Sequence, residues 1–277
     1  MNRLIKKTIP VAALVLLASS CLKASTLDIG LVANYKFNGD YSDSSQARNN
    51  LLPSVGAALV TDRFGNNNSA MKSSNQSYAQ STSNISVSGV SSRTVSIWAK
   101  SLDANRDFSY AYWGGWNSQR ADGAGGNWAI SYLPWKITQP WRAYPEDKSG
   151  NIYVDGNYWV YLTTTDPLDI SGSWHNLVYT YDNNNMASSV YLNGVLQANN
   201  ASSTNMEIMN TVDSPIHIGS PDASFDVSID DMRIYNRALS SSEVATLYAT
   251  ESVPEPSALS LLAVGLGGLA LMRRRRS

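Results

Sequence analysis

Residues 189–197, SVYLNGVLQ, hold two short runs of β-type residues separated by Asn193-Gly194. Asn-Gly is the pair that most readily accepts positive φ at both central positions of a two-residue type I′ turn. The stretch therefore predicts a β-hairpin. Other short alternating runs, bounded by Gly, Asn, Asp or Ser, predict further strands; they lie at residues 31–38, 93–100, 176–182, 215–220 and 225–236.

The sequence predicts one helix, at SSSEVATLYA (240–249). Ser240 and Glu243 have the spacing of a capping box, in which each side chain satisfies a free backbone N–H at the helix start. Many strands with a single late helix are typical of an all-β sandwich or jelly roll of two antiparallel sheets.

The two ends of the chain differ from the rest. Residues 1–24 begin with Arg3, Lys6 and Lys7 ahead of an apolar run, which is the order of charge and hydrophobicity in a secretory signal peptide. Cleavage after Ala24 would remove the single cysteine, Cys21; the alternative is a lipoprotein signal that lipidates this cysteine. In either case the exported domain lacks a disulfide and relies on its core.

Charge excludes one class of partner. Four Lys or Arg lie in residues 1–24 and four near the C-terminus, so residues 25–253 keep 13 basic against 21 acidic residues, a formal charge of −8. Nucleic acid requires a basic surface, and no nucleic-acid partner is expected. The length of this span fits one domain.

Several motifs resemble those of bacterial LamG-like domains of the concanavalin A-type lectin/glucanase class, in the order of that family. They cover most of residues 28–250 and read GLVANYKFNGDYSDSS, TDRFGNNNSA, TVSIWAK, SWHNLVYTYDNN, VYLNGVLQ and VSIDDMRIYNRALSSSEVATLY. The resemblance implies a sandwich of two curved antiparallel sheets, spanning residues 25–250, with the first and last strands adjacent. It does not imply one activity.

The tail, residues 251–277, resembles a PEP-CTERM sorting signal. It contains Pro254, Glu255 and Pro256, then fifteen mostly apolar residues (258–272), then a basic cluster of Arg273, Arg274, Arg275 and Arg276. The resemblance implies processing near Pro-Glu-Pro by an exosortase in the inner membrane of a Gram-negative bacterium, followed by transfer to the cell surface or its exopolysaccharide.

The length of the apolar run favours a transient membrane anchor. Fifteen helical residues span about 22 Å, short of the ~30 Å hydrocarbon core. The arginines would stay on the cytoplasmic side. A permanent C-terminal anchor is the alternative.

Six of the eight tryptophans lie between residues 106 and 162. Aromatic rings stack on the C–H faces of sugars, and nearby amides or guanidiniums bond the hydroxyls. Those beside turn formers are the preferred carbohydrate binders, whereas Trp98 and Trp174 are expected in the core; for any single tryptophan a packing role is the alternative. The predicted carbohydrate site consists of Trp113, Trp116, Trp135, Trp141, Asn117, Arg120 and Arg142.

A structural Ca²⁺ is the second predicted ligand. Asp40 and Asp43 lie in one loop, and Asp230 and Asp231 lie in the last strand motif. Calcium takes six to eight oxygen ligands, which two acidic loops on adjacent terminal strands could supply. The alternative is that these aspartates cap turns.

Catalysis is not predicted, although an acid pair assembled from distant loops is the open alternative. The Glu-x-Asp-x-x-Glu strand of related glucanases is missing, and His175 and His217 have no apparent nucleophile or orienting group. The sequence therefore predicts an exported carbohydrate-binding or matrix protein. A structural adhesin and a divergent glycan hydrolase or lyase are the alternatives.

Replacing Pro254, Glu255 and Pro256 with alanine should leave an unprocessed precursor, because the processing site is lost while the apolar run remains. Mass spectrometry of the surface-released protein measures this. A wild-type mature form that still ends in Ser277 would contradict processing.

Overall fold

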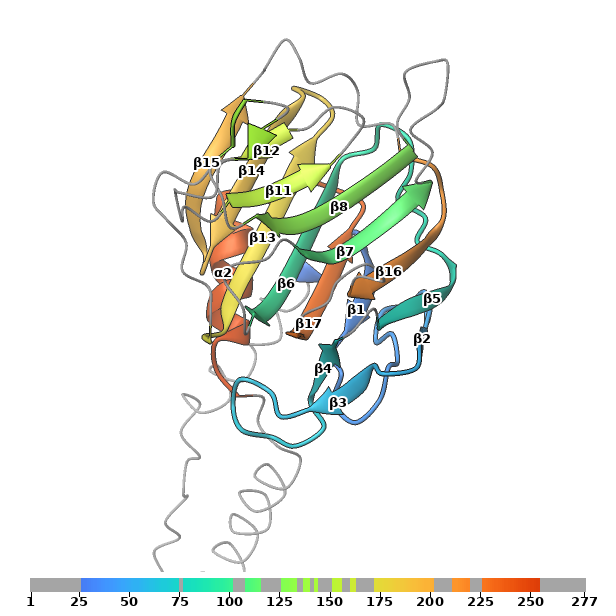
Figure 1. Cartoon of the computed structure of the whole chain (residues 1–277). Coiled ribbons are helices and arrows are strands. Elements are labelled where there is room, and N and C mark those ends of the chain that lie inside the picture. Colours follow the sequence, from blue (N-terminus) through green and yellow to red (C-terminus); the bar gives the residue numbers. More distant parts are fainter. Residues whose placement is uncertain are drawn as a thin grey trace, which may run out of the picture.

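The computed structural model describes residues 26–74, 77–101, 108–115, 126–133, 137–139, 142–143, 151–155, 160–162, 172–201, 211–219 and 226–254. These residues form two antiparallel sheets packed face to face, with one helix at the C-terminal end (Figure 1). The predicted all-β sandwich is confirmed.

The larger sheet has eight strands in the order β15-β14-β13-β6-β17-β4-β3, with β1 also pairing with β17. The predicted adjacency of the first and last strands is thereby confirmed. The strands are β1 (Leu31–Tyr35), β3 (Ala58–Val60), β4 (Ala70–Ser73), β6 (Arg93–Ser101), β13 (His175–Asp182), β14 (Ala187–Leu192), β15 (Val195–Ala201) and β17 (Val227–Tyr235).

The second sheet has seven strands in the order β12-β11-β8-β7-β16-β5-β2, and β9 and β10 form a separate pair. The seven strands are β2 (Leu51–Pro53), β5 (Tyr78–Asn84), β7 (Phe108–Gly115), β8 (Gly126–Leu133), β11 (Asn151–Asp155), β12 (Val160–Leu162) and β16 (Pro215–Gly219). The separate pair consists of β9 (Ile137–Gln139) and β10 (Arg142–Ala143).

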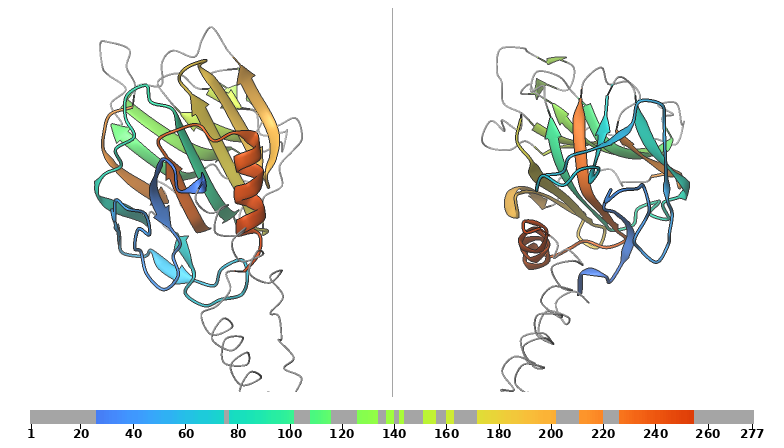
Figure 2. Two further views of the ribbon diagram at one scale, coloured as in Figure 1. Left: turned by 180° about the vertical axis from the view of Figure 1, so that it is seen from behind. Right: turned by 90° about the horizontal axis from the view of Figure 1, so that it is seen from below.

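Helix α2 (Ser241–Glu251) covers the outer face of the eight-stranded sheet (Figure 2). Its predicted capping box is present: the Ser240 hydroxyl accepts the Glu243 N–H, and the Glu243 carboxylate accepts the Ser240 N–H. Successive side chains of β13 belong to two hydrophobic clusters. Leu177 and Tyr179 face the core between the sheets, whereas Val178 packs under the helix.

The predicted hairpin joins β14 to β15. Asn193 and Gly194 have φ of +50° and +76°, as the Asn-Gly pair indicated. A Cβ at Gly194 would lie 2.9 Å from the Tyr248 ring on α2. The position therefore needs glycine both for its backbone and for the approach of the helix.

Trp113 lies in the core, and its prediction as a carbohydrate binder is wrong. The side chain has no exposed surface, and its indole N–H donates to the Val87 carbonyl at 2.9 Å. The neighbouring Gly-Gly suggested a loop, but strand β7 runs through Gly115. Strand alternation thus turns the ring inward.

Trp113→Ala should lower the free energy of unfolding by about 3–5 kcal/mol, because it leaves a cavity between the sheets. Leu52→Ala is the control, since that side chain is 63 % exposed. Chemical denaturation of both variants measures the difference. Equal free energies of unfolding for the two variants would contradict the assignment of Trp113 to the core.

Candidate functional site

Three aromatic side chains form a ladder on the outer face of the seven-stranded sheet. The His217 ring on β16 stacks on Tyr112 of β7, with ring centroids 4.6 Å apart and planes 2° apart. On its other side, His217 meets Tyr78 of β5 at 5.3 Å and 55°. We call Tyr78, Tyr112 and His217 the aromatic ladder.

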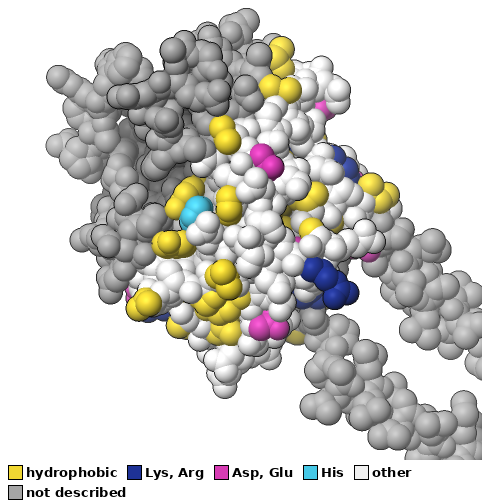
Figure 3. Space-filling view, turned by 90° about the vertical axis from the view of Figure 1, so that its right-hand side faces the viewer, with side chains coloured by type: hydrophobic (Ala, Val, Ile, Leu, Met, Phe, Trp, Pro, Cys, Tyr) yellow, Lys and Arg dark blue, Asp and Glu magenta, His cyan; other side chains and the backbone are white. Residues whose placement is uncertain are grey.

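Strand register places the ladder on the outer face. Ala111, Ile216 and Ile218, which alternate with its members along the strands, are fully buried in the core. The ladder side chains are instead half-buried. Figure 3 shows this side of the molecule, where a histidine lies among hydrophobic side chains.

The ladder continues to the edge of the sheet without a charged group. His217 pairs with Gln80 of β5, which in turn pairs with Leu52 on the edge strand β2. Side by side, these residues present rings, one amide and one exposed aliphatic side chain. Such a surface suits a ligand that is neutral and has both apolar and hydroxyl groups.

Burial lowers the pKa of His217, so its imidazole is neutral near pH 7. Its Nδ1 atom is buried and has no hydrogen-bond partner in the described part of the chain. The sequence suggested only a structural histidine, because Tyr78 and Tyr112 are distant in the chain. Its position in PIHIGS, directly between the apolar Ile216 and Ile218, was the one signal that its side chain points to the opposite face from theirs.

Most of the sequence-predicted carbohydrate residues lie outside the described residues. This applies to Trp116, Asn117, Arg120, Trp135 and Trp141, while Arg142 lies in β10 without a described side chain. They stay predictions.

The two tryptophans expected in the core differ. Trp98 is 6 % exposed and lies beneath α2, where Tyr248 stacks on it at 5.7 Å. Trp174 is partly exposed, with the Lys100 ammonium 5.3 Å from its ring. The core prediction is therefore wrong for Trp174, because it precedes β13 instead of lying within it.

Asp43 organises the loop after β1. One carboxylate oxygen accepts the backbone N–H groups of Asn34 and Ser45, at 2.9 and 2.8 Å, and the other accepts the Asn49 N–H at 2.9 Å. Asp40 is exposed and accepts the Ser42 N–H at 2.8 Å. The contacts from Asp43 to Ser45 and from Asp40 to Ser42, each two residues further along the chain, are those of turn-forming aspartates.

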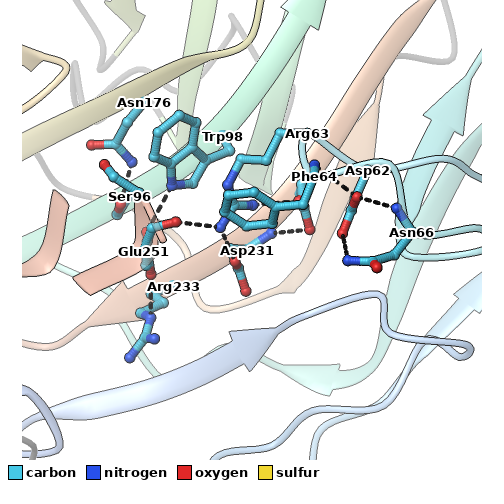
Figure 4. A network of polar contacts seen from close by, with 12 residues as sticks. Asp62, Arg63, Phe64, Asn66, Ser96, Trp98, Asn176, Asp231, Arg233 and Glu251 are labelled. Atoms are coloured by element: carbon cyan, nitrogen blue, oxygen red, sulfur yellow. Dashed lines mark hydrogen bonds and ion pairs between the residues drawn. The ribbon is translucent and has the colours of Figure 1, made fainter. Parts of the chain in front are cut away.

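Asp230 and Asp231 bind Arg63, and Figure 4 labels Arg63 and Asp231. One guanidinium nitrogen pairs with the Asp230 carboxylate, and the other donates to Asp231 at 2.6 Å. A bulge in β17 between Asp230 and Arg233, with Asp231 at φ +39°, allows consecutive carboxylates to face one cation.

The loop that carries Arg63 is shaped by Asp62. Its carboxylate accepts the backbone N–H groups of Phe64 and Asn66, both at 2.8 Å. The guanidinium lies between two rings, 4.4 Å from the centroid of Phe64 and 4.5 Å from that of Trp98. Cation–π contact thus adds to the ion pairs.

Glu251, the last residue of α2, completes this buried network. Its carboxylate accepts the Trp98 indole N–H at 2.9 Å and the Arg233 Nε–H at 2.7 Å. Its backbone carbonyl accepts from Arg63 at 2.7 Å. We call Arg63, Trp98, Asp230, Asp231, Arg233 and Glu251 the Glu251 network.

The predicted calcium ligands are therefore not brought together as one open carboxylate cluster: Asp43 binds backbone N–H groups, and Asp230 and Asp231 bind Arg63. Within the described residues, no group of three or more His, Cys, Asp or Glu side chains is arranged to hold a metal ion. Calcium binding stays a prediction. The described residues also include no helix long and apolar enough to cross a membrane.

The fold and the sequence motifs define a class of β-sandwich proteins. A model of the concanavalin A-like lectin/glucanases superfamily matches residues 73–245, and the chain belongs to this superfamily. A model of the PEP-CTERM protein-sorting motif matches residues 252–276, which is the sorting signal expected from the sequence. A search of curated protein sequences gave no match.

Solved structures share the fold at low identity. Domain 4 of AbnA, an extracellular GH43 arabinanase from Geobacillus stearothermophilus solved with arabinotriose, is 23 % identical, with 79 % of this chain and 98 % of that chain covered and a TM-score of 0.59. The binding domain of Paraclostridial Mosquitocidal Protein 1 is 19 % identical, with 81 % and 53 % covered and a TM-score of 0.58.

The ligand-binding domain of botulinum neurotoxin serotype D, solved with N-acetylneuraminic acid, is 16 % identical. The match covers 82 % of this chain and 52 % of that chain, with a TM-score of 0.58. In both toxin comparisons, therefore, the chain matches about half of the other structure.

The Glu251 network holds three carboxylates against two guanidiniums. Burial, reinforced by Asp231, raises the pKa of Asp230 to about 8 despite the attraction of Arg63. Burial also raises the pKa of Glu251 to about 7, against the attraction of Arg233. The folded protein consequently keeps a proton that the unfolded chain releases near pH 4.

Raising the pH from 6.5 to 8.5 should lower the free energy of unfolding by about 2 kcal/mol. A raised carboxyl pKa stabilises the folded state fully below the unfolded pKa, and this contribution is lost as the pH passes the folded pKa. Below pH 6.5 the lowered pKa of His217 acts in the opposite direction. Denaturation across this range measures the slope.

Asp230→Asn is the control for that slope. It removes the titrating group while Arg63 keeps Asp231 as a partner. The variant should show a flatter pH dependence above pH 6.5. An unchanged slope would place the titration elsewhere in the protein.

Proposed function

We propose that this chain is an exported, surface-sorted protein that binds carbohydrate on the aromatic ladder, and that it associates with a surface polysaccharide of a Gram-negative bacterium. The observation that carries the proposal is the parallel stacking of His217 and Tyr112 on an outward sheet face. The partly exposed aromatic groups of the ladder offer the apolar C–H groups of a sugar a contact surface at small entropic cost.

Charge selects the class of glycan. The ladder and its neighbours Gln80 and Leu52 are uncharged near neutral pH, and the span 25–253 carries a formal charge of −8. An acidic polysaccharide would be repelled by the net charge and would find no cation on the ladder. We therefore infer a neutral glycan.

The comparisons support this proposal at the level of the fold. AbnA domain 4 was solved with arabinotriose, and the serotype D toxin domain with N-acetylneuraminic acid. Binding without turnover is proposed because the sequence lacks the Glu-x-Asp-x-x-Glu motif. Processing by an exosortase, with transient insertion of the apolar tail in the inner membrane, would deliver the protein to the surface.

Tyr112→Ala and His217→Ala should each weaken binding to neutral polysaccharide about tenfold, because each removes part of the aromatic contact surface and breaks the Tyr112–His217 stack. Trp174→Ala is the matched control, since it removes a partly exposed aromatic side chain that precedes β13, a strand of the other sheet. Retardation in gels containing arabinan, other neutral polysaccharides or acidic polysaccharides measures binding, and melting curves verify folding.

The outcomes separate the alternatives. Equal loss of binding in the Trp174 variant would contradict the ladder as the site. Binding to protein partners alone would favour an adhesin. Release of reducing ends from the polysaccharide would favour a hydrolase, and release of unsaturated products would favour a lyase.

A further inference from the structure

The Glu251 network lies at the junction between the folded domain and the sorting tail. The Glu251 side chain is 3 % exposed, and three donors from β6, β17 and the loop after β3 hold its carboxylate and carbonyl. Helix ends usually fray because their last carbonyls lack partners. Here the final residue of α2 is instead held by three donors that lie outside the helix.

The tail leaves the domain immediately after this residue. The Ser252 N–H and hydroxyl both donate to the Tyr248 carbonyl, at 2.9 and 2.6 Å, and they close the helix. Val253 is 58 % exposed, and Pro254 is exposed. The sorting-motif match begins at residue 252, so the motif and the helix cap share a residue.

This junction leaves little free chain. Only Ser252 and Val253 separate Glu251 from Pro254, and the fully extended chain from Glu251 to Pro254 spans only about 10 Å. An enzyme that binds its peptide substrate in an extended form needs several residues in line. Residues 251 and 252 have helical geometry and cannot enter such a cleft while the network holds them.

We propose that the Glu251 network is a latch that restrains processing of the sorting tail. The processing peptidase can then bind the residues that precede Pro254 only when the last turn of α2 opens. The proposal rests on the proposed processing of this tail. It assigns the surface formed by the α2 end and loop 61–69 as the face that the peptidase meets.

Opening of the latch is a local event. Trp98, Arg233 and Arg63 hold Glu251, whereas Arg237 and Glu243 pair at the opposite end of the same helix, at 2.8 Å. A variant at either end weakens α2. Only a variant at the Glu251 end releases the residues next to Pro254.

The test uses the full chain in cells that process it. Trp98→Phe removes the indole N–H donor but keeps a ring against Tyr248, and it should speed the appearance of the mature form about tenfold, since a hydrogen bond to a buried carboxylate is lost. Glu243→Gln is the control and should leave the rate unchanged. Pulse labelling with mass spectrometry measures both.

A spacer tests the mechanism without touching the network. Insertion of Gly-Ser-Gly-Ser between Ser252 and Val253 should also speed processing, and Trp98→Phe should add nothing to it. The latch is overturned if Trp98→Phe matches the wild type, if Glu243→Gln is equally fast, or if spacer and Trp98→Phe act independently.

An in vitro assay separates failure of the latch from failure of the proposed processing. A glutamate-specific endopeptidase applied to the full-length chain in detergent should cut after Glu251 slowly in the wild type and about tenfold faster in Trp98→Phe, with the Glu243 variant unchanged. Cutting after Glu251 at the same rate in all three would overturn the latch. Lack of processing in cells alongside the expected in vitro rates would contradict only the sorting proposal.

Discussion

The guanidinium of Arg63 joins parts of the chain that lie far apart in sequence. It binds the carboxylates of Asp230 and Asp231 on β17 and the backbone carbonyl at the end of α2, and it lies between the Phe64 and Trp98 rings. Two buried acidic groups so close together would repel each other in a medium of low dielectric constant. The cation that the loop after β3 supplies offsets this repulsion, together with the proton that the network retains.

The contacts of Arg63 also link strand β17 to the end of helix α2. The bulge at Asp231 interrupts the pairing of β17 with β6 between Asp230 and Arg233. At the helix end, Trp98 and Arg233 each donate a hydrogen bond to the Glu251 carboxylate. A buried cluster with more acids than bases thus closes the domain where the sorting tail starts, while the aromatic ladder occupies the other sheet.

Local signals in the sequence predicted the fold well. Asn193-Gly194 specified the hairpin through its tolerance of positive φ, and Ser240 with Glu243 specified the helix start. The ladder could not be predicted in this way, because it is made by register between β5, β7 and β16, which hydrophobic periodicity does not encode. Trp113 was misplaced for a related reason: Gly-Gly marks a turn only when the strand does not continue through it.

The position of β17 has a consequence for how the protein matures. This strand is among the last to be synthesised, yet it lies in the middle of its sheet and pairs with β1, β4 and β6. Until it arrives, the first strand lacks its partner, and the sheet is divided between two groups of strands. Contacts of such long sequence separation form slowly, and the core between the sheets cannot be completed before β17 is available to pair.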